Sequence, residues 1–322
     1  MTHIYLKLML LFSPAFIMNS LLQCFVRNDG APGLAMAAML VGSLSNIVLD
    51  IIFIFPLDMG IFGAILATGL APIISMLVLS AYLIKGKKGF GLCHGDISVA
   101  ALGRIISGGM SPCLAELSSG VVMLLFNFIL LKIAGNRGVA AFSIVTVVSL
   151  VCTAIFTGLS QGVQPLFSKY YGSSMGNVQR RLLKQGCATA LIISALLYSI
   201  IFLGSEQIVA LFNKDGDKLL QAYGVQGLRM YFAACPFMGL NILIATRFLS
   251  LERPIPAQII SMSRASLLLI PVSFLLSWRF KMIGLWCSYP MTELLVCLLA
   301  IFLCLRRELR QKRLCDSAGT EG

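Results

Sequence analysis

The stretch LSNIVLDIIFIFPLDMGIFGAILATG, residues 44–69, joins two apolar segments and holds an acid inside one of them. Segments 33–56 and 60–84 each supply the roughly twenty mostly apolar residues that span a bilayer as a helix, and residues 56–60 are the predicted turn. Asp50 is therefore expected within the hydrocarbon layer, where a carboxylate costs about 2.5 to 3.5 kcal/mol on insertion scales. An acid kept at this cost predicts a functional site.

Two polar side chains are the predicted partners of Asp50. Asn46 lies one helical turn earlier on the same face. Thr68 returns on the next helix at a similar depth, because at about 1.5 Å per residue Asp50 and Thr68 lie roughly 12 and 15 Å from the turn. The sequence predicts that the three side chains gather their oxygens around one small cation or proton.

The whole chain resembles this stretch in composition. Of its 322 residues 58% are hydrophobic and 12% are charged, and the mean hydropathy is +0.91. These values exclude a soluble globular domain. We predict an all-α polytopic membrane protein with nine transmembrane helices. They are expected at residues 4–25, 33–56, 60–84, 104–133, 138–163, 185–204, 225–249, 257–278 and 283–305, the first being a span and not a cleaved signal peptide.

The net charge of +12 has a topological explanation. If the C-terminus is cytoplasmic and the N-terminus outside, seventeen of the 25 Lys and Arg residues fall on the cytoplasmic side and eight on the other. The positive-inside rule favours this orientation. The run RRELRQKR at 306–313 is expected to be a solvated tail beside anionic lipid headgroups. No nucleic-acid partner is predicted.

The sequence contains a weak internal repeat. Pro14 and Asn19 in the first predicted helix have the spacing of Pro236 and Asn241 in the seventh, and further matches lie at an offset of 223 residues. Helices one to three therefore read as an old copy of helices seven to nine, as is frequent in transporters. Helices four to six, residues 104–204, have no counterpart. A parent of two six-helix bundles would then lack its first three helices here.

This repeat predicts four parts of the chain, which are an incomplete N-terminal bundle, a cytoplasmic linker, a C-terminal six-helix bundle and a basic cytoplasmic tail. Their expected bounds are 1–84, 85–103, 104–305 and 306–322.

Four further polar residues are candidates for a substrate path or for coupling. Glu116 and Asn127 lie on one stripe of the fourth helix, and the alternative is a protonated glutamate in a packing seam. Gln161 lies in GLSQGVQPLFSKYYG, residues 158–172, where glycines and a proline are expected to break the helix, or simply to end it. Glu293 is either a packing carboxyl or part of the path. Arg264 is expected to snorkel from the inner edge.

No cofactor, catalytic residue or zinc-type metal site is expected. The ten cysteines are scattered without a C-x-x-C pair, and the two histidines lack a second ligand nearby in sequence. A membrane-embedded enzyme needs clustered His, Asp or Glu near one interface, and the sequence offers no such cluster. The only metal considered is a sodium ion at Asn46, Asp50 and Thr68.

Five segments resemble the multidrug and toxic compound extrusion (MATE) family of cation-coupled exporters, in particular its bacterial branch that resembles the staphylococcal drug exporter. They are FVRNDGAP, NIVLDIIFIF, MGIFGAILATG, GNRGVAAFSI and GLSQGVQPLFSKYYG, in the family's order. The resemblance covers residues 4 to about 305. It implies a twelve-helix protein of two six-helix bundles, of which this chain would supply helices four to twelve.

The resemblance also implies a coupling site and an activity. Asn46, Asp50 and Thr68 match the spacing of the family's N-terminal cation site, although that site takes another Asp from the family's first helix. Glu116 resembles the acid of a second branch by helix only, and residues 225–249 hold no matching acid. The implied function is export of small, amphipathic and often cationic organic compounds in exchange for Na⁺ or H⁺, across a bacterial cytoplasmic membrane.

Three readings remain open beside an active exporter. The chain is a fragment that works with an upstream fragment carrying the missing helices, or a truncated transporter without function. The third is a lipid-precursor flippase of the related superfamily, which would line its cleft with several basic residues where this chain offers only Arg264.

Overall fold

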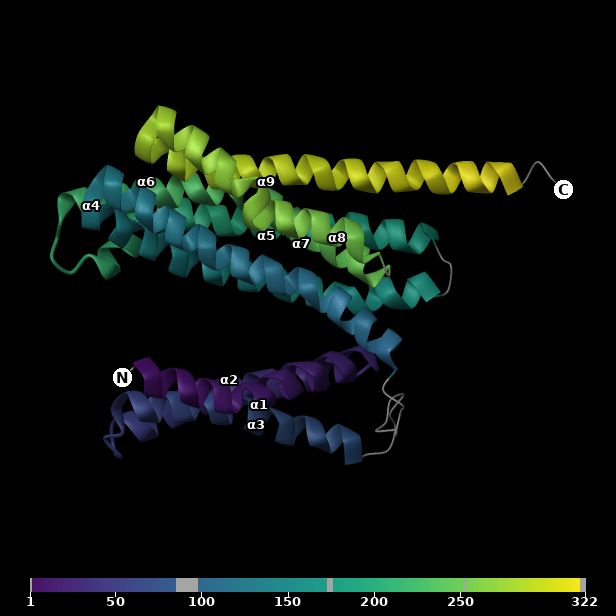
Figure 1. Ribbon diagram of the computed structural model, residues 1–322, viewed down its shortest axis with the longest axis horizontal. Coiled ribbons are helices and arrows are strands. Elements are labelled where there is room, and N and C mark those ends of the chain that lie inside the picture. Colours follow the sequence, from purple (N-terminus) through teal and green to yellow (C-terminus); the bar gives the residue numbers. More distant parts are fainter. Residues whose placement is uncertain (1, 85–97, 173–175, 252, 319–322) are drawn as a thin grey trace. The chain divides into compact units, whose positions relative to one another are not determined.

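The computed structural model describes residues 2–84, 98–172, 176–251 and 253–318, and every regular element among them is helical (Figure 1). The chain divides into two compact units, Met1–Asp96 and Ile97–Gly322. The first unit contains α1 (Thr2–Asn28), α2 (Pro32–Ile54) and α3 (Gly60–Ile84). The second contains α4 (Val99–Gly172), α5 (Gly176–Phe212), α6 (Lys218–Tyr231), η1 (Phe232–Ala234), α7 (Cys235–Ser250), α8 (Pro254–Met262), η2 (Ser263–Leu267) and α9 (Leu269–Ala318).

The first unit is a three-helix bundle in which small residues bring the helices close. Pro32 begins α2, where a proline costs no hydrogen bond. A Cβ added to Gly42 of α2 would meet the Ser75 side chain of α3 at 3.1 Å, so the two helices approach closely at this point. The bundle therefore fixes the depth of Asp50 on α2 relative to Thr68 on α3.

The α2–α3 turn uses two left-handed residues. Asp58 has a φ of 48° and Gly60 a φ of 52°. Among the described residues only one other non-glycine has a positive φ, which is Lys281 with 51°. Asp58 and Lys281 are separated by 223 residues, the offset of the sequence repeat. An unusual backbone conformation therefore recurs at matching positions of the two units.

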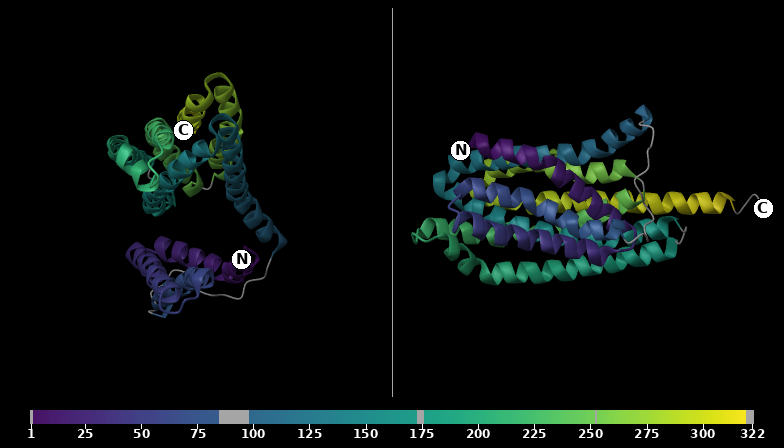
Figure 2. Two further views of the ribbon diagram at one scale, coloured as in Figure 1. Left: turned by 90° about the vertical axis from the view of Figure 1, so that its left-hand side faces the viewer. Right: turned by 90° about the horizontal axis from the view of Figure 1, so that it is seen from below.

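In the second unit α4 and α9 each double back on themselves (Figures 1 and 2). The helical angles are interrupted only at Gly135 in α4 and at Lys281 in α9. Three residues after each reversal lies a glycine whose position leaves too little space for a Cβ atom. A Cβ on Gly138 would lie 2.7 Å from the Ala134 Cβ, and one on Gly284 would collide with the Leu276 carbonyl.

The core of the second unit is aromatic. Trp286 is fully buried, and Phe126 and Phe142 stack with ring centroids 5.2 Å apart. These residues form one cluster with Phe156 and Phe232, so that α4, α9 and the η1 segment share a single core. Aromatic side chains contribute most of the contact area in such a core. Residues of α7, of α8 and of the part of α9 after Lys281 pack in a second, smaller cluster.

Seven helices in the described part of the chain are long and apolar enough to cross a membrane, where the sequence predicted nine. The number differs because two pairs of predicted helices are continuous. Residues 104–133 and 138–163 lie in α4, and residues 257–278 and 283–305 lie in the run from α8 to α9.

One other prediction needs correction. The glycines and proline of residues 158–172 do not break a helix, because α4 stays helical from Asn136 to its end at Gly172. A proline inside a membrane helix is tolerated when neighbouring groups satisfy the freed carbonyl. The predicted tail 306–322 is helical as far as Ala318, where α9 ends. Of the predicted linker 85–103, residues 85–97 lie outside the described residues, and α4 begins at Val99.

Candidate functional site

The first unit brings the predicted polar residues of α2 and α3 together. The Asn46 amide Nδ2 donates to the Thr68 hydroxyl Oγ1 over 3.5 Å, and that hydroxyl donates to the Ala64 carbonyl over 2.9 Å. Asn46, Asp50 and Thr68 are all half-buried. Helical spacing puts Asn46 and Asp50 on one face of α2, and the close α2–α3 packing carries Thr68 to that face. The amide and the hydroxyl are thus held in a fixed relation.

Asp50 carries an oxygen whose hydrogen-bonding capacity is unused. Its Oδ1 is buried and has no hydrogen-bond partner within the described part of the chain. A buried carboxylate oxygen without a partner is costly, and such an atom calls for an explanation such as a bound ion, a water or a proton. Because the Asn46 amide is turned to Thr68, the protein itself does not satisfy this oxygen.

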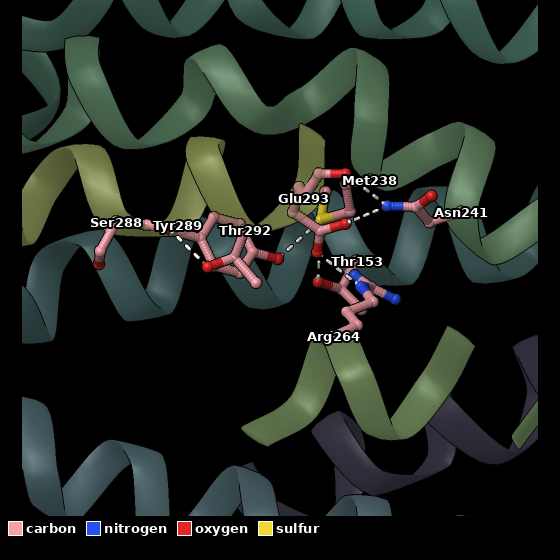
Figure 3. Close-up of polar contacts among 8 residues, drawn as sticks. All are labelled: Thr153, Met238, Asn241, Arg264, Ser288, Tyr289, Thr292 and Glu293. Carbon is pink, nitrogen blue, oxygen red and sulfur yellow. Dashed lines mark hydrogen bonds and ion pairs between the residues drawn. The ribbon is translucent and has the colours of Figure 1, made fainter. Parts of the chain in front are cut away.

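The second unit contains a polar cluster centred on Glu293 of α9 (Figure 3). The Glu293 side chain is fully buried, at 0% exposed, and its Oε1 accepts from Arg264 Nε over 2.6 Å. Its other oxygen, Oε2, accepts from Asn241 Nδ2 over 2.7 Å, and the same amide donates to the Glu293 backbone carbonyl over 2.9 Å. Both carboxylate oxygens therefore have protein donors.

Tyrosines and a methionine surround this cluster. Tyr289 lies one turn before Glu293 on α9 and donates its hydroxyl to the Met238 sulfur over 3.3 Å (Figure 3). The Tyr289 ring stacks on that of Tyr231 with centroids 4.2 Å apart and planes 1° apart. The Arg264–Glu293 ion pair thus lies one helical turn from the stacked rings of Tyr231 and Tyr289.

The other polar residues that the sequence predicted for a substrate path do not form one cluster in the structure. Glu116 is exposed on α4, whereas Asn127 is half-buried. Within the described residues no hydrogen bond joins this pair, so they share a helix face without making a site on their own. Gln161 is half-buried and takes part in a polar interaction. Only Glu293 of these four candidates lies in a polar cluster whose contacts are defined.

Sequence reasoning missed the partners of Glu293. Arg264 was expected to snorkel, which is wrong, because it forms an ion pair with a buried carboxylate. The Pro–Asn spacing shared by the first and seventh predicted helices did single out Asn241 as a repeat marker, and it is the second partner of Glu293. A lone arginine and a lone acid 29 positions apart carry no sequence signal of contact.

One ion pair lies outside the apolar spans, at the start of α6. Asp217 accepts from the N–H groups of Leu219 and Leu220 and from Arg137 Nε, the last over 2.6 Å. Burial raises the pKa of Asp217, but these N–H groups and the Arg137 guanidinium outweigh it and hold the pKa below its ordinary value. Asp217 therefore joins α6 to the reversal of α4.

A cavity of about 970 Å³ opens near the same end, between α5 and α6. Its polar lining includes Glu206 and Arg229, which pair over 3.1 Å, together with Gln221. Gln221 donates to the Glu206 backbone carbonyl over 2.9 Å. Two of the charges lining this cavity, those of Glu206 and Arg229, therefore satisfy one another.

Comparisons with known proteins agree with this architecture. A model of the MatE family matches residues 113–275. The multidrug export protein MepA of Staphylococcus saprophyticus is 26% identical over 304 residues, covering 94% of this chain and 66% of that protein. The MepA protein of Staphylococcus aureus is 26% identical over 308 residues, with the same coverage. The chain thus spans just under two thirds of the length of these relatives, which are exporters and not enzymes.

Solved structures share the fold. An outward-facing multidrug resistance MATE family transporter of the MOP superfamily superposes with a TM-score of 0.88 at 20% identity, over 96% of this chain and 70% of that one. A MOP superfamily transporter from Pyrococcus furiosus gives a TM-score of 0.86 at 20% identity, over 94% and 68%. Since the family model covers half of the sequence and the helical fold agrees, this chain belongs to the MatE family, the multidrug and toxic compound extrusion proteins.

Proposed function

We propose that the chain is the main part of a cation-coupled antiporter that exports small, amphipathic and often cationic organic compounds. The observation that carries the proposal is the unused Oδ1 of Asp50, one helical turn after Asn46, whose amide contacts the Thr68 hydroxyl. A carboxylate, an amide and a hydroxyl are hard oxygen ligands, which suit Na⁺ or a proton. No cofactor is needed for such exchange.

The coupling would work through the charge of Asp50. An incoming cation neutralises the carboxylate and draws the Asn46 and Thr68 oxygens toward it. This stabilises one arrangement of the helices, and substrate stabilises another. Exchange follows only if each ligand binds the two arrangements with different affinity, because a ligand with equal affinity for both shifts nothing.

The proposal includes a topology of nine crossings, equivalent to helices four to twelve of a twelve-helix transporter. The reversals at Gly135 and Lys281 support it, because each would divide one long helix into two crossings. The C-terminus would be cytoplasmic, in a bacterial plasma membrane, as the distribution of Lys and Arg favours. Three further helices, from the same polypeptide or from a separate fragment, would complete the first bundle, in line with the 66% coverage of the relatives.

The substrate path would lie along the polar residues of the second unit. Glu116, Asn127 and Gln161 on α4 are the proposed contacts, and Glu293 on α9 would take part in the path by positioning Arg264. An exposed acid such as Glu116 attracts cationic compounds, while the half-buried amides offer neutral hydrogen-bonding groups.

The experiment is dye export from proteoliposomes with an imposed sodium or proton gradient. Two proteins are compared, residues 1–322 and the same residues preceded by the first three helices of the Staphylococcus aureus relative. We expect gradient-dependent export of a cationic dye from the extended protein and little from residues 1–322.

Two outcomes are informative against the proposal. Full export by residues 1–322 would overturn the need for three further helices. An extended protein that folds, inserts and exports nothing under either gradient would overturn the antiporter assignment and favour a transporter that has lost its function.

A further inference from the structure

The Arg264 guanidinium uses only part of its hydrogen-bonding capacity in the ion pair. Arginine offers five N–H donors in a planar fork, and its pairing with a carboxylate is frequently bidentate. Here the Glu293 carboxylate is shared, because Oε1 takes Arg264 Nε and Oε2 takes the Asn241 amide. The ion pair therefore uses Arg264 Nε, and among the described residues neither terminal amino group of Arg264 donates a hydrogen bond to Glu293.

Exposure within the cluster is uneven. The Glu293 side chain is 0% exposed, whereas that of Arg264 is 22% exposed. Tyr231 and Tyr289 are half-buried, and Asn241 is fully buried. A ligand that approaches the cluster would thus meet the guanidinium and the tyrosine rings, while the carboxylate and its amide partner lie behind them.

The backbone at Arg264 is also unusual. Arg264 is the second residue of η2, a single turn of π-helix at Ser263–Leu267 between α8 and α9. Such turns are rare and are frequently found at functional sites. The wider turn displaces Arg264 from the regular helical position, and Glu293 holds its side chain there through Nε.

From these observations we propose that Arg264, backed by Glu293 and flanked by Tyr231 and Tyr289, binds the carboxylate of a small aromatic organic anion or zwitterion. The terminal guanidinium edge matches a planar carboxylate in a bidentate manner. The stacked tyrosines offer a flat surface for the ligand's ring. This rests on the proposed export function and extends its substrates from cations to aromatic compounds that carry a carboxylate.

Glu293 has a specific role in this site. It positions the guanidinium, yet its negative charge also opposes that of an arriving carboxylate. Removing the charge of Glu293 should therefore strengthen anion binding, whereas removing the charge of Arg264 should abolish it. A purely structural ion pair makes a different prediction, because neither substitution would then change the binding of a carboxylate relative to that of its neutral ester.

The test is equilibrium binding to purified residues 1–322 in phosphatidylcholine nanodiscs, without any gradient. The probes are anthracene-9-carboxylate, its methyl ester and 9-(aminomethyl)anthracene, which share one fluorescent ring and differ in charge. Wild-type protein should bind the carboxylate more tightly than the ester. Because the readout is binding, it does not depend on whether the chain exports anything.

Four variants separate the outcomes. Arg264→Gln should weaken carboxylate binding about tenfold, as expected for one lost charge-assisted contact, and leave binding of the ester unchanged. Arg264→Lys keeps the charge without the fork and should lie between Arg264→Gln and wild type. Glu293→Gln should tighten carboxylate binding several-fold. Arg279→Gln, an exposed arginine of α9, is the matched control and should change nothing.

Three results would overturn the proposal. The first is equal carboxylate binding by wild type and by folded Arg264→Gln or Arg264→Lys protein. The second is a loss of binding in Glu293→Gln as large as in Arg264→Gln. The third is complete displacement of the probe when phosphatidylglycerol replaces phosphatidylcholine, which would assign the guanidinium to the headgroup of an anionic lipid.

Discussion

Asp50 in the first unit and Glu293 in the second are acids inside apolar helices, but their surroundings are opposite. Asp50 is half-buried, and its buried Oδ1 has no partner among the described residues. Glu293 is fully buried, and each of its oxygens accepts a short hydrogen bond, from Arg264 or from Asn241. In the described part of the chain, Asp50 thus has an oxygen without a hydrogen-bond partner, while Glu293 is paired with an arginine.

The difference indicates where a mobile cation can act. At Glu293 a cation would have to displace a guanidinium that is fixed at 2.6 Å. At Asp50 it would meet an oxygen that no hydrogen-bond donor of the described residues occupies. An acid inside a membrane is expensive in either case. The first unit therefore suits reversible cation binding, and the second suits a permanently paired acid that positions its arginine.

The largest expected effect is that of Asp50→Asn on coupling. The amide keeps the shape of the side chain but removes the charge that a cation or proton neutralises. In the extended protein, gradient-driven dye export should fall to background at unchanged expression, because the ionised acid is the expensive species and folding should survive its loss. Dye export is measured against imposed sodium and proton gradients, with Asp58→Asn in the α2–α3 turn as the control. Unchanged export by Asp50→Asn would make Asp50 a structural residue.

The second prediction concerns how much Arg264 and Glu293 each contribute to the stability of the folded protein. Arg264→Gln leaves the carboxylate of Glu293 buried without its cation and should destabilise the protein by about 3 kcal/mol. Glu293→Gln leaves a guanidinium that is 22% exposed and can be hydrated, so its cost should be clearly smaller. Thermal unfolding of both variants and of the double variant measures this asymmetry. Equal costs for the two single variants would contradict the exposure argument.

The third prediction refines the site at Asp50. Asn46→Ala and Thr68→Ala each remove one neutral oxygen and should raise the cation concentration for half-maximal export a few-fold, without abolishing it. Thr68→Ser keeps the hydroxyl that bonds the Ala64 carbonyl and should behave like wild type. If Thr68→Ala has no effect on the cation dependence, only Asn46 and Asp50 belong to the site.

The smallest effect is expected at Asp217, a carboxylate outside the spans that provides a reference for the other two. Its pKa is lowered in the folded protein, so its contribution to stability is present above the ordinary carboxyl range and is lost as pH falls through the folded pKa. Asp217→Asn keeps an N-cap but loses the attraction to Arg137. The melting temperature of the variant should therefore be slightly lower than wild type at pH 7, and the two should converge below about pH 4. A difference that persists in acid would exclude the ion pair as its cause.

The sequence predicted the parts of the molecule that depend on local pattern. Apolar segments located the helices, and the spacing of Asn46 and Asp50 with the returning Thr68 predicted the approach of α2 and α3 that the structure contains. What it could not predict depends on tertiary packing. The Arg264–Glu293 pair joins two helices through a π-helical turn, and nothing local marks that turn. The prediction that Gly158 and Gly162 break the helix is wrong, because a glycine can also occupy a regular helix. No atom lies within 4 Å of a Cβ added at either position, so packing does not require a glycine there.

The reversals at Gly135 and Lys281 bear on how the protein is made. Residues 99–134 and 136–172 form the two arms of α4, and a single residue with non-helical angles separates them. The connection is therefore too short to stay in water as a loop while only one arm is inserted. During synthesis the two arms would have to enter the lipid together, as a preformed helical hairpin, and the same holds for the arms of α9 on either side of Lys281. Lengthening either reversal with a flexible, hydrophilic segment should uncouple the arms, and the insertion machinery would then handle them one at a time.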